Sequence, residues 1–270
     1  MLALDAVIPL AVGWFWTIGF EGRQRCNRNS LGLPMDETCP GHIVVVASGG
    51  LDSTTLAHLL HRRGSPLTLL AVDYGQRHRV ELDFAKRTAD RLNAGFERVD
   101  LLGLGRLLTG SALTDRAVDV PDGHYTDERM ASTVVPNRNA LILDMAVGLA
   151  VSRGASAVAF GAHTGDHPIY SDCRPEFVES FTCTSRIANE GSLDSRFQVL
   201  APFLAMTKAQ IVSVGAELGV PFEETWSCYR GQVVHCGRCG TCVERREAFS
   251  LAGVQDPTAY ASTDDSLSGW

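Results

Sequence analysis

Short apolar runs alternate with amphipathic stretches over most of the chain from Gly41 onward. The first apolar run, Ile43–Val46, consists of β-branched residues, which is typical of a buried strand in a parallel sheet. Strands that alternate with helices predict βαβ units and a doubly wound α/β fold, whose ligands bind at the carboxyl ends of the strands. The pattern predicts strands at 43–46, 67–72, 96–100, 156–160 and 197–203, and helices at 53–63, 79–93, 137–154, 174–189 and 207–219.

The first forty residues lack this alternation. An apolar stretch, Ala6–Phe20, precedes a polar stretch without periodicity, and it is too short to predict a membrane span. It also lacks the basic region that opens a signal peptide. We therefore expect residues 1–40 to be an N-terminal extension, either a loosely ordered arm or a non-native start upstream of Met35. At the other end, the polar residues 252–270 predict a flexible tail.

The overall composition narrows the class of protein. With 270 residues, the chain can form one large α/β domain with a small appendage. The net charge of -7 argues against broad binding to nucleic acid, which needs clustered Lys and Arg. Eight cysteines in a chain of this length are too sparse for a secreted disulfide scaffold. We therefore expect a reducing, cytoplasmic compartment and no membrane partner.

The first predicted strand leads into the sequence SGGLDST, Ser48–Thr54. A glycine-rich turn between a strand and a helix presents unpaired backbone N–H groups at the positive end of the helix dipole, where a phosphate binds well. Gly49 and Gly50 would let the backbone approach the phosphate. Asp52 would repel a bare phosphate, but it suits a site where Mg²⁺ bridges its carboxylate and the phosphate. The turn lacks the Gly-Lys-Ser/Thr of a Walker A motif. The alternative is an ordinary turn with Ser or Asp as the helix cap.

Other polar residues follow the carboxyl ends of later strands. Asp73–Gln76 come directly after the second strand, where either a ligand contact or a simple glycine turn would explain them. Arg138 opens a helix, a position that disfavours a cation unless an anionic ligand lies there. The loop 161–174 combines two histidines, two aspartates and one arginine. A metal site at His163, Asp166 and His167 is disfavoured, because no regular element fixes the spacing of these residues.

Four cysteines lie close together in the sequence: Cys228, Cys236, Cys239 and Cys242, with the spacing C-x7-C-x2-C-x2-C. Four thiolates at such intervals suit a closed, tetrahedral structural zinc site, and the glycines between them permit tight turns. An iron–sulfur cluster is the chemical rival, and free thiols are the remaining alternative. Cys173 lies outside this cluster and is expected to be an inert thiol or a thiol close to a ligand.

The segment SGGLDSTT resembles the signature loop of the pyrophosphatase-loop superfamily of ATP-dependent adenylating enzymes. Within that superfamily, the chain resembles the 7-cyano-7-deazaguanine synthase family over about Gly41–Leu251. The other motifs that carry this resemblance are YGQRHRVE (74–81), VPNRN (135–139), YSDCRPEF (170–177), CYRG (228–231) and CGRCGTC (236–242). The sequence departs from the family pattern at Ser171, where many relatives have proline, and in GDHPIY, where many have Thr-Asp-Phe-Ser-Gly-Tyr.

The resemblance implies a fold of the adenine nucleotide alpha hydrolase-like type, which is a doubly wound, mostly parallel sheet with a small C-terminal zinc-binding lobe. It implies an ATP-binding α/β domain at 41–225 and the zinc-binding lobe at 226–251. The implied reaction converts 7-carboxy-7-deazaguanine, ammonia and ATP to 7-cyano-7-deazaguanine through adenylated carboxylate and amide intermediates, with release of AMP and pyrophosphate. The implied metals are one structural Zn²⁺ per chain, and Mg²⁺ with the co-substrate ATP.

The resemblance also implies a set of site residues. The implied catalytic residues are Ser48, Asp52 and Ser53, and the implied metal ligands are Cys228, Cys236, Cys239 and Cys242. The implied ATP-binding residues are Ala47, Ser48, Gly49, Gly50, Leu51, Asp52, Ser53, Thr54, Thr55, Leu56 and Ala57. The implied substrate-binding residues are Tyr74, Gln76, Arg77, His78, Arg138, Asn139, Asp166, His167, Asp172 and Arg174. The acceptor of the ammonium proton stays open among His78, His163 and His167.

Two other functions stay open. Another pyrophosphatase-loop ligase, such as a tRNA-thiolating or protein-modifying relative, would share the ATP loop but differ in the loop 161–174. In a nucleic-acid-binding zinc module, the cysteines would be the functional site, but the acidic balance and the few nearby basic residues, Arg238, Arg245 and Arg246, disfavour it. We expect small-molecule substrates as partners and no stable nucleic acid. A homodimer is one option for the assembly, which the sequence does not fix.

Overall fold

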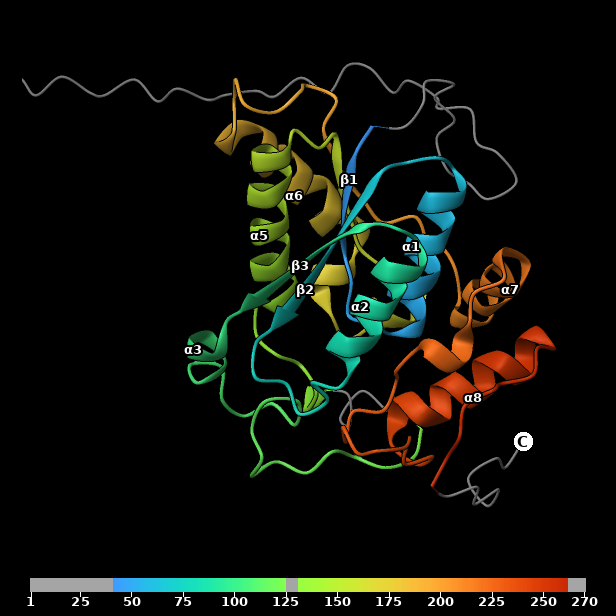
Figure 1. The fold of residues 1–270 in the computed structure, drawn as a ribbon. Coiled ribbons are helices and arrows are strands. Elements are labelled where there is room, and N and C mark those ends of the chain that lie inside the picture. Colours follow the sequence, from blue (N-terminus) through green and yellow to red (C-terminus); the bar gives the residue numbers. More distant parts are fainter. Residues whose placement is uncertain (1–40, 125–130, 262–270) are drawn as a thin grey trace, which may run out of the picture. The chain divides into compact units, whose positions relative to one another are not determined.

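A five-stranded parallel sheet organises the described part of the protein (Figure 1). The computed structural model describes residues 41–124 and 131–261, so the N-terminal extension expected at 1–40 and residues 262–270 of the expected tail lie outside the described residues. The strands are β1 (Ile43–Val46), β2 (Leu67–Asp73), β3 (Gly95–Asp100), β4 (Ala157–Ala159) and β5 (Gln198–Leu200). The α-helices are α1 (Leu51–Arg62), α2 (Glu81–Arg91), α3 (Leu102–Gly105), α5 (Arg138–Arg153), α6 (Pro175–Ala188), α7 (Lys208–Leu218) and α8 (Gly240–Ala252), and the short 3-10 helices are η1 (Thr164–Asp166), η2 (Ser171–Cys173) and η3 (Phe222–Glu224).

The strand order, β3-β2-β1-β4-β5, is that of a doubly wound fold. β1 pairs in parallel with β2 on one side and with β4 on the other, so Ile43 lies opposite both Leu67 and Ala157. The direction of winding reverses between β1 and β4. Ligands of such sheets bind at this point, outside the carboxyl ends of the strands. The predicted parallel α/β fold is confirmed, and it directs the search for a site to the loops that follow Val46 and Ala159.

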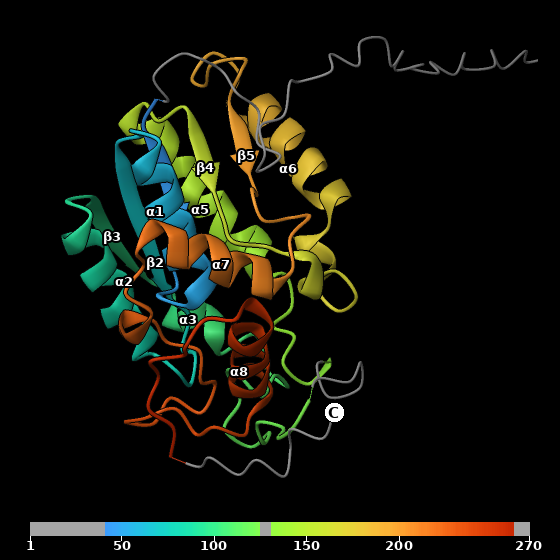
Figure 2. The same ribbon diagram turned by 90° about the vertical axis from the view of Figure 1, so that its right-hand side faces the viewer.

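Helices cover both faces of the sheet (Figures 1 and 2). α1, α2 and α7 lie on one face, with α7 packed against α1, and α5 and α6 lie on the other. β2 is buried along its whole length, as expected for a central strand that is covered on both sides. The main core cluster joins strand residues such as Val44, Leu70 and Val158 to Leu143 and Ala146 of α5.

The predicted ends of α7 are confirmed by its caps. Thr207 Oγ1 accepts a hydrogen bond from Gln210 N at 3.3 Å, and Gln210 Oε1 accepts one from Thr207 N at 2.8 Å. This reciprocal pair is a capping box, which satisfies two backbone donors at the start of the helix. Gly219 ends the helix in the left-handed region, with φ at 68°.

Helix α8 is not predicted by the apolar pattern, because its buried residues are not all apolar. They include Cys242 and Arg245, and the Arg245 side chain is almost fully buried. Its guanidinium group donates to Thr225 Oγ1 at 2.7 Å and to the Phe222 carbonyl oxygen at 2.9 Å. A buried arginine that is satisfied in this way looks, in the sequence, like a residue on a solvent-exposed face.

Residues 253–261, which we expected to belong to a flexible tail, contact the region around the cysteines. Asp256 accepts hydrogen bonds from Arg245 Nε at 3.3 Å and from the Tyr260 hydroxyl at 2.5 Å. Ala261 N donates to the His235 carbonyl oxygen at 2.8 Å. Among the described residues, no helix has the length and apolar character that a membrane crossing requires.

Asp73, the last residue of β2, is a fully buried carboxylate. Its Oδ2 accepts hydrogen bonds from Arg79 Nη2 at 2.5 Å and from Arg98 Nη2 at 2.9 Å, and its Oδ1 accepts one from Gly75 N at 3.1 Å. Burial by itself would raise the pKa of Asp73, but the hydrogen bonds from Gly75, Arg79 and Arg98 outweigh it and hold the pKa below its usual value.

We expect Asp73→Asn to lower the free energy of unfolding by roughly 2 kcal/mol, because the amide loses charge-assisted hydrogen bonds from two arginines. A pKa that is lower in the folded state stabilises the fold above the unfolded pKa of about 4, and this stabilisation is lost as the pH falls below that value. Urea unfolding at about pH 7 and about pH 3 should therefore show that wild type and Asp73→Asn differ less in free energy of unfolding at the lower pH. Asp90→Asn, which removes an exposed acid paired with Lys86, is the control. A difference of equal size at both pH values would contradict this explanation.

Candidate active site

A cavity of about 240 Å³ opens at the carboxyl ends of β1 and β4. Its walls include the loop after β1, which we call the phosphate loop (47–53), and the loop after β4. α2, α5, α7 and α8 each contribute side chains to the wall as well. The cavity thus lies at the point where the winding of the sheet reverses, which is where this kind of fold binds its ligands.

The phosphate loop leads from β1 into the first turn of α1. Gly50 is the N-cap residue of α1 and provides no side-chain cap, so the first backbone N–H groups of the helix have no partner within the helix. Ser48 Oγ lies 3.1 Å from Ser53 Oγ and accepts a hydrogen bond from Gly50 N at 3.2 Å. Backbone donors and hydroxyl groups are therefore gathered at one place in the cavity wall, which suits a phosphate group.

Close packing against α2 requires glycine at position 49, whereas the sequence suggested close approach to a phosphate as the reason for this glycine. Its φ is +82°, and a Cβ atom here would lie 2.1 Å from the Glu81 carbonyl oxygen and 2.6 Å from Ala85 N. Any other residue would push α2 away from the phosphate loop. The close approach that the structure shows is therefore between the loop and α2.

Asp52, in the first turn of α1, lies among several charged side chains. Its Oδ2 is 3.4 Å from Lys208 Nζ and 3.9 Å from His163 Nε2. Its Oδ1 is buried and has no hydrogen-bond partner among the described residues. A buried carboxylate oxygen without a donor is costly unless a ligand completes its contacts. This oxygen fits a hard cation such as Mg²⁺.

Lys208 is a candidate site residue that the sequence analysis missed. It is the first residue of α7, and its Nζ donates to Glu244 Oε2 of α8 at 2.7 Å. Burial alone would lower the pKa of Lys208, but the charges of Asp52 and Glu244 raise it above its usual value, so the side chain stays cationic. A usable signal exists in the sequence, since Lys208 is a cation at the start of a helix, as Arg138 is.

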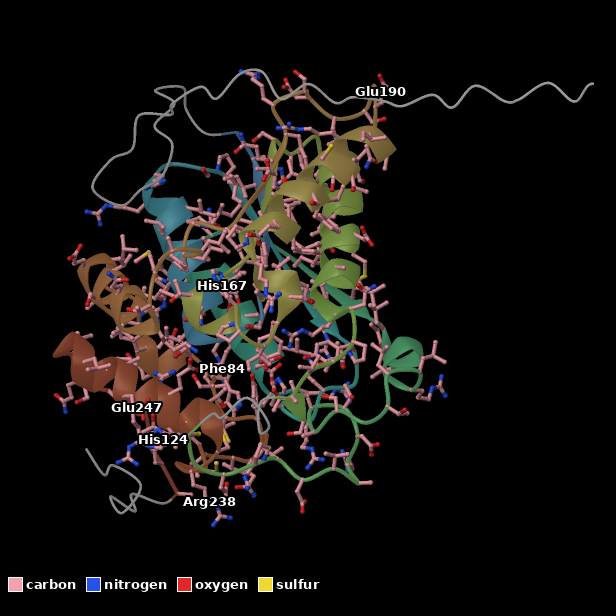
Figure 3. All side chains as sticks on the ribbon, turned by 180° about the vertical axis from the view of Figure 1, so that it is seen from behind. Phe84, His124, His167, Glu190, Arg238 and Glu247 are labelled. Atoms are coloured by element: carbon pink, nitrogen blue, oxygen red, sulfur yellow. The ribbon has the colours of Figure 1, made fainter. Side chains whose placement is uncertain are left out.

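The loop after β4 brings His163 and Asp166 to the phosphate loop. His163 Nδ1 accepts a hydrogen bond from Gly165 N at 3.0 Å, and Asp166 Oδ2 accepts one from His163 N at 3.1 Å. Burial raises the pKa of Asp166, while the nearby His163 acts against this rise. Asp166 lines the cavity, whereas His167, labelled in Figure 3, is not part of its wall.

Another part of the wall is formed by tyrosines around one arginine. Tyr74, Tyr170, Tyr229 and Arg138 all line the cavity, and the charge of Arg138 acts on the hydroxyl groups of Tyr74 and Tyr170. The Tyr170 hydroxyl lies 2.7 Å from Thr133 Oγ1. Burial raises the pKa values of Tyr74 and Tyr170, so both stay neutral near neutral pH. A guanidinium group among aromatic rings suits a planar, anionic ligand.

His78 and Glu81 form a buried pair in the cavity wall. His78 Nε2 lies 3.4 Å from Glu81 Oε1, and the His78 ring centroid is 5.3 Å from that of Tyr229. Burial, with the charge of Arg138, lowers the pKa of His78 to about 3, so its imidazole is neutral near neutral pH. Burial raises the pKa of Glu81 to about 8, although Gln76 Nε2 donates a hydrogen bond to it at 3.2 Å. Glu81 was not among the predicted site residues.

Several predicted substrate-binding residues do not line this cavity. Gln76 hydrogen-bonds the backbone nearby, at 2.9 and 3.1 Å. Arg77 donates to two backbone carbonyl groups at 2.7 and 2.8 Å, and Arg174 does so at 2.8 and 3.5 Å. Asp172 accepts a hydrogen bond from Asn139 N at 3.1 Å and lines an adjacent cavity of about 130 Å³. Asn139 itself lines the main cavity.

Some of the predicted ATP-binding residues line the cavity and others do not. Most of the phosphate loop lines the cavity, whereas Thr54–Ala57 are buried within the packing of α1. Thr54 Oγ1, for example, lies 3.5 Å from Thr88 Oγ1 of α2. These four residues therefore hold the helix in place and do not contact the cavity.

The four clustered cysteines, Cys228, Cys236, Cys239 and Cys242, converge in space. All four are buried, and their sulfur atoms lie within 4.8 Å of one another. Cys239 Sγ is 3.5 Å from Cys242 Sγ and 4.0 Å from Cys228 Sγ. Backbone N–H groups of Cys236 and Cys239 point to cysteine sulfurs at 3.4 and 3.3 Å, an arrangement that favours thiolates. The set fits a tetrahedral metal ion.

The segment 226–251, which we call the cysteine segment, also forms part of the cavity wall. Ser227, Thr241 and Glu244 line the cavity, and Trp226 N donates to the Gly49 carbonyl oxygen at 2.9 Å. The cysteine segment is thus joined directly to the phosphate loop. Farther along α8, Glu247 contacts His124 outside the cavity, at 2.6 Å (Figure 3).

The strand order, the phosphate loop at the point of reversal and the site after β1 and β4 define an α/β protein of the pyrophosphatase-loop class. Comparison with known families gives a more specific result, because residues 42–253 match the model of the family described as "Queuosine biosynthesis protein QueC". The chain belongs to this family.

Curated relatives agree with the family match. The 7-cyano-7-deazaguanine synthase of Rhizobium johnstonii is 56% identical over 221 residues, which cover 82% of this chain and 92% of the relative. The protein of the same name from Paracoccus denitrificans is 54% identical over 221 residues, which cover 82% of this chain and 94% of the relative. The similarity therefore extends over nearly the whole of each relative.

Solved structures of other proteins share parts of the fold at low sequence identity. The NMN synthetase from Francisella tularensis matches with a TM-score of 0.44 and 15% identity, over 81% of this chain and 79% of the other. The U34-tRNA thiolase NcsA from Methanococcus maripaludis matches with a TM-score of 0.43 and 13% identity, over 86% of this chain and 81% of the other. Similarity at this level carries no argument about activity.

Proposed function

We propose that the protein is an ATP-dependent carbon–nitrogen ligase that converts 7-carboxy-7-deazaguanine and ammonia to 7-cyano-7-deazaguanine. Membership of the family and identities of 56% and 54% to proteins named 7-cyano-7-deazaguanine synthase support this proposal. The structural observation that carries it is the buried, unpartnered Asp52 Oδ1, which lies in the wall of the same cavity as the phosphate loop and Lys208.

The chemistry explains why ATP is needed. A carboxylate is a poor electrophile, because oxide would have to leave. Transfer of AMP to the carboxylate oxygen gives an acyl adenylate and releases pyrophosphate; ammonia then forms the C–N bond, and AMP leaves with the electron pair of the C–O bond. A second adenylation, now of the amide oxygen, allows loss of AMP and a proton to give the nitrile. Each adenylation consumes one ATP.

The residues of the cavity suit these steps. The N–H groups and hydroxyls of the phosphate loop, together with the Lys208 ammonium group, are placed to stabilise the charge that develops on departing pyrophosphate. Mg²⁺ would be held through Asp52 and would neutralise phosphate charge. Arg138, with Tyr74 and Tyr170 beside it, is placed to hold the planar carboxylic acid.

For the four cysteines, the proposed metal is one structural Zn²⁺, because four buried sulfurs leave no coordination position open for substrate. The proposal divides the chain into an ATP-binding domain at 41–225 and a zinc-binding lobe at 226–251. The negative net charge and the free cysteines favour a cytoplasmic protein without a stable nucleic acid partner. Size-exclusion chromatography tests for a homodimer.

The decisive experiment incubates the purified protein with 7-carboxy-7-deazaguanine, ammonium, ATP and Mg²⁺, and identifies the products by mass spectrometry. We expect the nitrile, AMP and pyrophosphate, with the amide as an intermediate. ADP and phosphate as the only nucleotide products would contradict adenylation. Sulfur transfer to a tRNA, in place of nitrile formation, would support a thiolating ligase instead.

The contact between Glu244 and Lys208 gives a separate prediction. We expect Glu244→Gln to raise the KM for ATP about tenfold, because Lys208 loses the charged partner that holds it beside Asp52. Steady-state kinetics with varied ATP measures this change. The matched control is Glu247→Gln on the same helix, which lies outside the cavity and should leave the KM unchanged. Equal effects of the two variants would show that general perturbation of α8 is responsible.

A further inference from the structure

The proposed reaction needs a proton acceptor, because ammonium has no lone pair with which to attack the acyl adenylate. Near neutral pH, almost all ammonia in water is protonated. The acidic and imidazole groups that line the cavity are Asp52, His78, Glu81, His163, Asp166 and Glu244. The following inference rests on the proposed function and asks which of these groups takes the proton.

Most of these groups already face a partner that makes them poor acceptors. Asp52 and Glu244 share the Lys208 ammonium group, at 3.4 and 2.7 Å. Asp166 faces His163 at 3.7 Å and also accepts its backbone N–H. His163 in turn lies between Asp166 and Asp52. These groups are therefore engaged in the charge network of the phosphate loop.

Glu81 stands apart from this network. It is 8% exposed, lines the cavity, and within the described residues forms no ion pair with lysine or arginine. Gln76 Nε2 donates to its Oε1 at 3.2 Å, and Gln76 is itself locked to the backbone at 2.9 and 3.1 Å. A buried carboxylate that is held in a fixed orientation, but lacks a fixed cation, attracts a small cation such as ammonium.

The position of Glu81 is suitable for the reaction. Its backbone carbonyl packs against Gly49, so its side chain starts beside the loop that is proposed to hold the phosphates of ATP. We propose that the Glu81 carboxylate binds ammonium and takes one proton from it, beside the acyl adenylate. The ammonia that remains forms the C–N bond, AMP leaves with the C–O electron pair, and the new amide nitrogen gives its surplus proton to water.

The groups around Glu81 favour this role. His78 lies 3.4 Å away, and the Arg138 charge and the Tyr74 hydroxyl also act on Glu81. Burial raises the pKa of Glu81 to about 8, which is close to the working pH expected of an efficient general base. A bound ammonium ion would favour the ionised form of Glu81. His78 is a weaker acceptor, since burial lowers its pKa to about 3.

The test compares two nucleophiles in the wild-type protein and in Glu81→Gln. Ammonium must lose a proton before it attacks, whereas hydroxylamine is neutral near neutral pH and traps an acyl adenylate without a base. For Glu81→Gln, we expect amide formation from ammonium to fall about 100-fold. Hydroxamate formation, and substrate-dependent exchange of pyrophosphate into ATP, should stay at the wild-type level. Asp83→Asn, an exposed acid on the same helix, is the matched control and should change none of these rates.

The outcomes separate this inference from the proposed function. Wild-type protein that shows neither exchange nor hydroxamate with 7-carboxy-7-deazaguanine would overturn the proposed function. If the wild type shows both and Glu81→Gln loses hydroxamate as strongly as amide, Glu81 binds substrate or ATP and the inference is wrong. An unchanged ammonium rate would also overturn it. Glu81→Asp, which keeps a carboxylate, should recover part of the ammonium rate, and failure to do so in a folded variant would contradict proton transfer.

Discussion

Asp52→Asn should reduce turnover by at least about 1,000-fold, while the melting temperature stays close to that of the wild type. The Oδ1 atom of Asp52 has no hydrogen-bond partner among the described residues, so its loss removes little from the fold. Lys208 would still be paired with Glu244, so no cation is left without a counter-charge. The effect should therefore fall on adenylation, and substrate-dependent exchange of pyrophosphate into ATP measures that step directly.

A second substitution makes the test of the phosphate loop specific. Ser48→Ala removes the hydroxyl that Gly50 N contacts at 3.2 Å, and it should also abolish most of the exchange activity with the fold intact. Asp90→Asn, which changes an exposed acid outside the cavity wall, should behave like the wild type. Wild-type exchange rates in both loop variants would show that the phosphate loop is misassigned.

Cys239→Ser should lower the free energy of unfolding by about 4 kcal/mol, because the binding energy of a structural metal is also folding energy. The turnover of Cys239→Ser should fall together with its stability. Ser227, Thr241 and Glu244 of the cysteine segment line the cavity, so a disordered segment would leave the cavity without part of its wall. Metal content by elemental analysis, thermal unfolding and turnover, measured on the same preparation, test the three effects together.

The exposed Cys183 of α6 provides the matched control for this experiment. Cys183→Ser should retain about one zinc per chain, the wild-type stability and the wild-type turnover, because it lies outside the cluster. Full metal content and stability in Cys239→Ser would contradict a structural metal site. A brown protein that contains iron and no zinc would show that the four cysteines hold an iron–sulfur cluster.

Local sequence patterns predict the framework well, for identifiable reasons. The apolar strand before SGGLDST, the Thr207 cap and Gly219 each depend on neighbours within a few residues, and the structure has all three as expected. The cysteines converge because their spacing is short enough to fix their geometry locally. Features of this kind are encoded within one turn or one element.

The cavity wall could be predicted only in part, because it depends on which elements meet in space. Glu244 belongs to a helix without a clear apolar face, and its contact with Lys208 joins α8 to α7. Gln76 and Arg77 are predicted substrate-binding residues that do not line the cavity. They follow a strand at the same edge of the sheet, but Arg77 binds backbone carbonyl groups, and Gln76 binds the backbone and Glu81. In the sequence, a polar residue at a strand end looks the same whether its side chain faces the cavity or binds groups of the protein nearby.

The hydrogen bond from Trp226 N to the Gly49 carbonyl oxygen has a consequence for the order of events on the ribosome. A nascent chain exposes its N-terminal elements first, so β1 and α1 are made long before their partner at Trp226. The nucleotide site is therefore completed late, after α8 has emerged. A translation product that stops before Cys242 lacks Glu244, which lines the cavity and accepts a hydrogen bond from Lys208 beside the phosphate loop. Chains that terminate before Glu244 are thus expected to be inactive, so a nonsense mutation shortly before this codon should be as damaging as an early one.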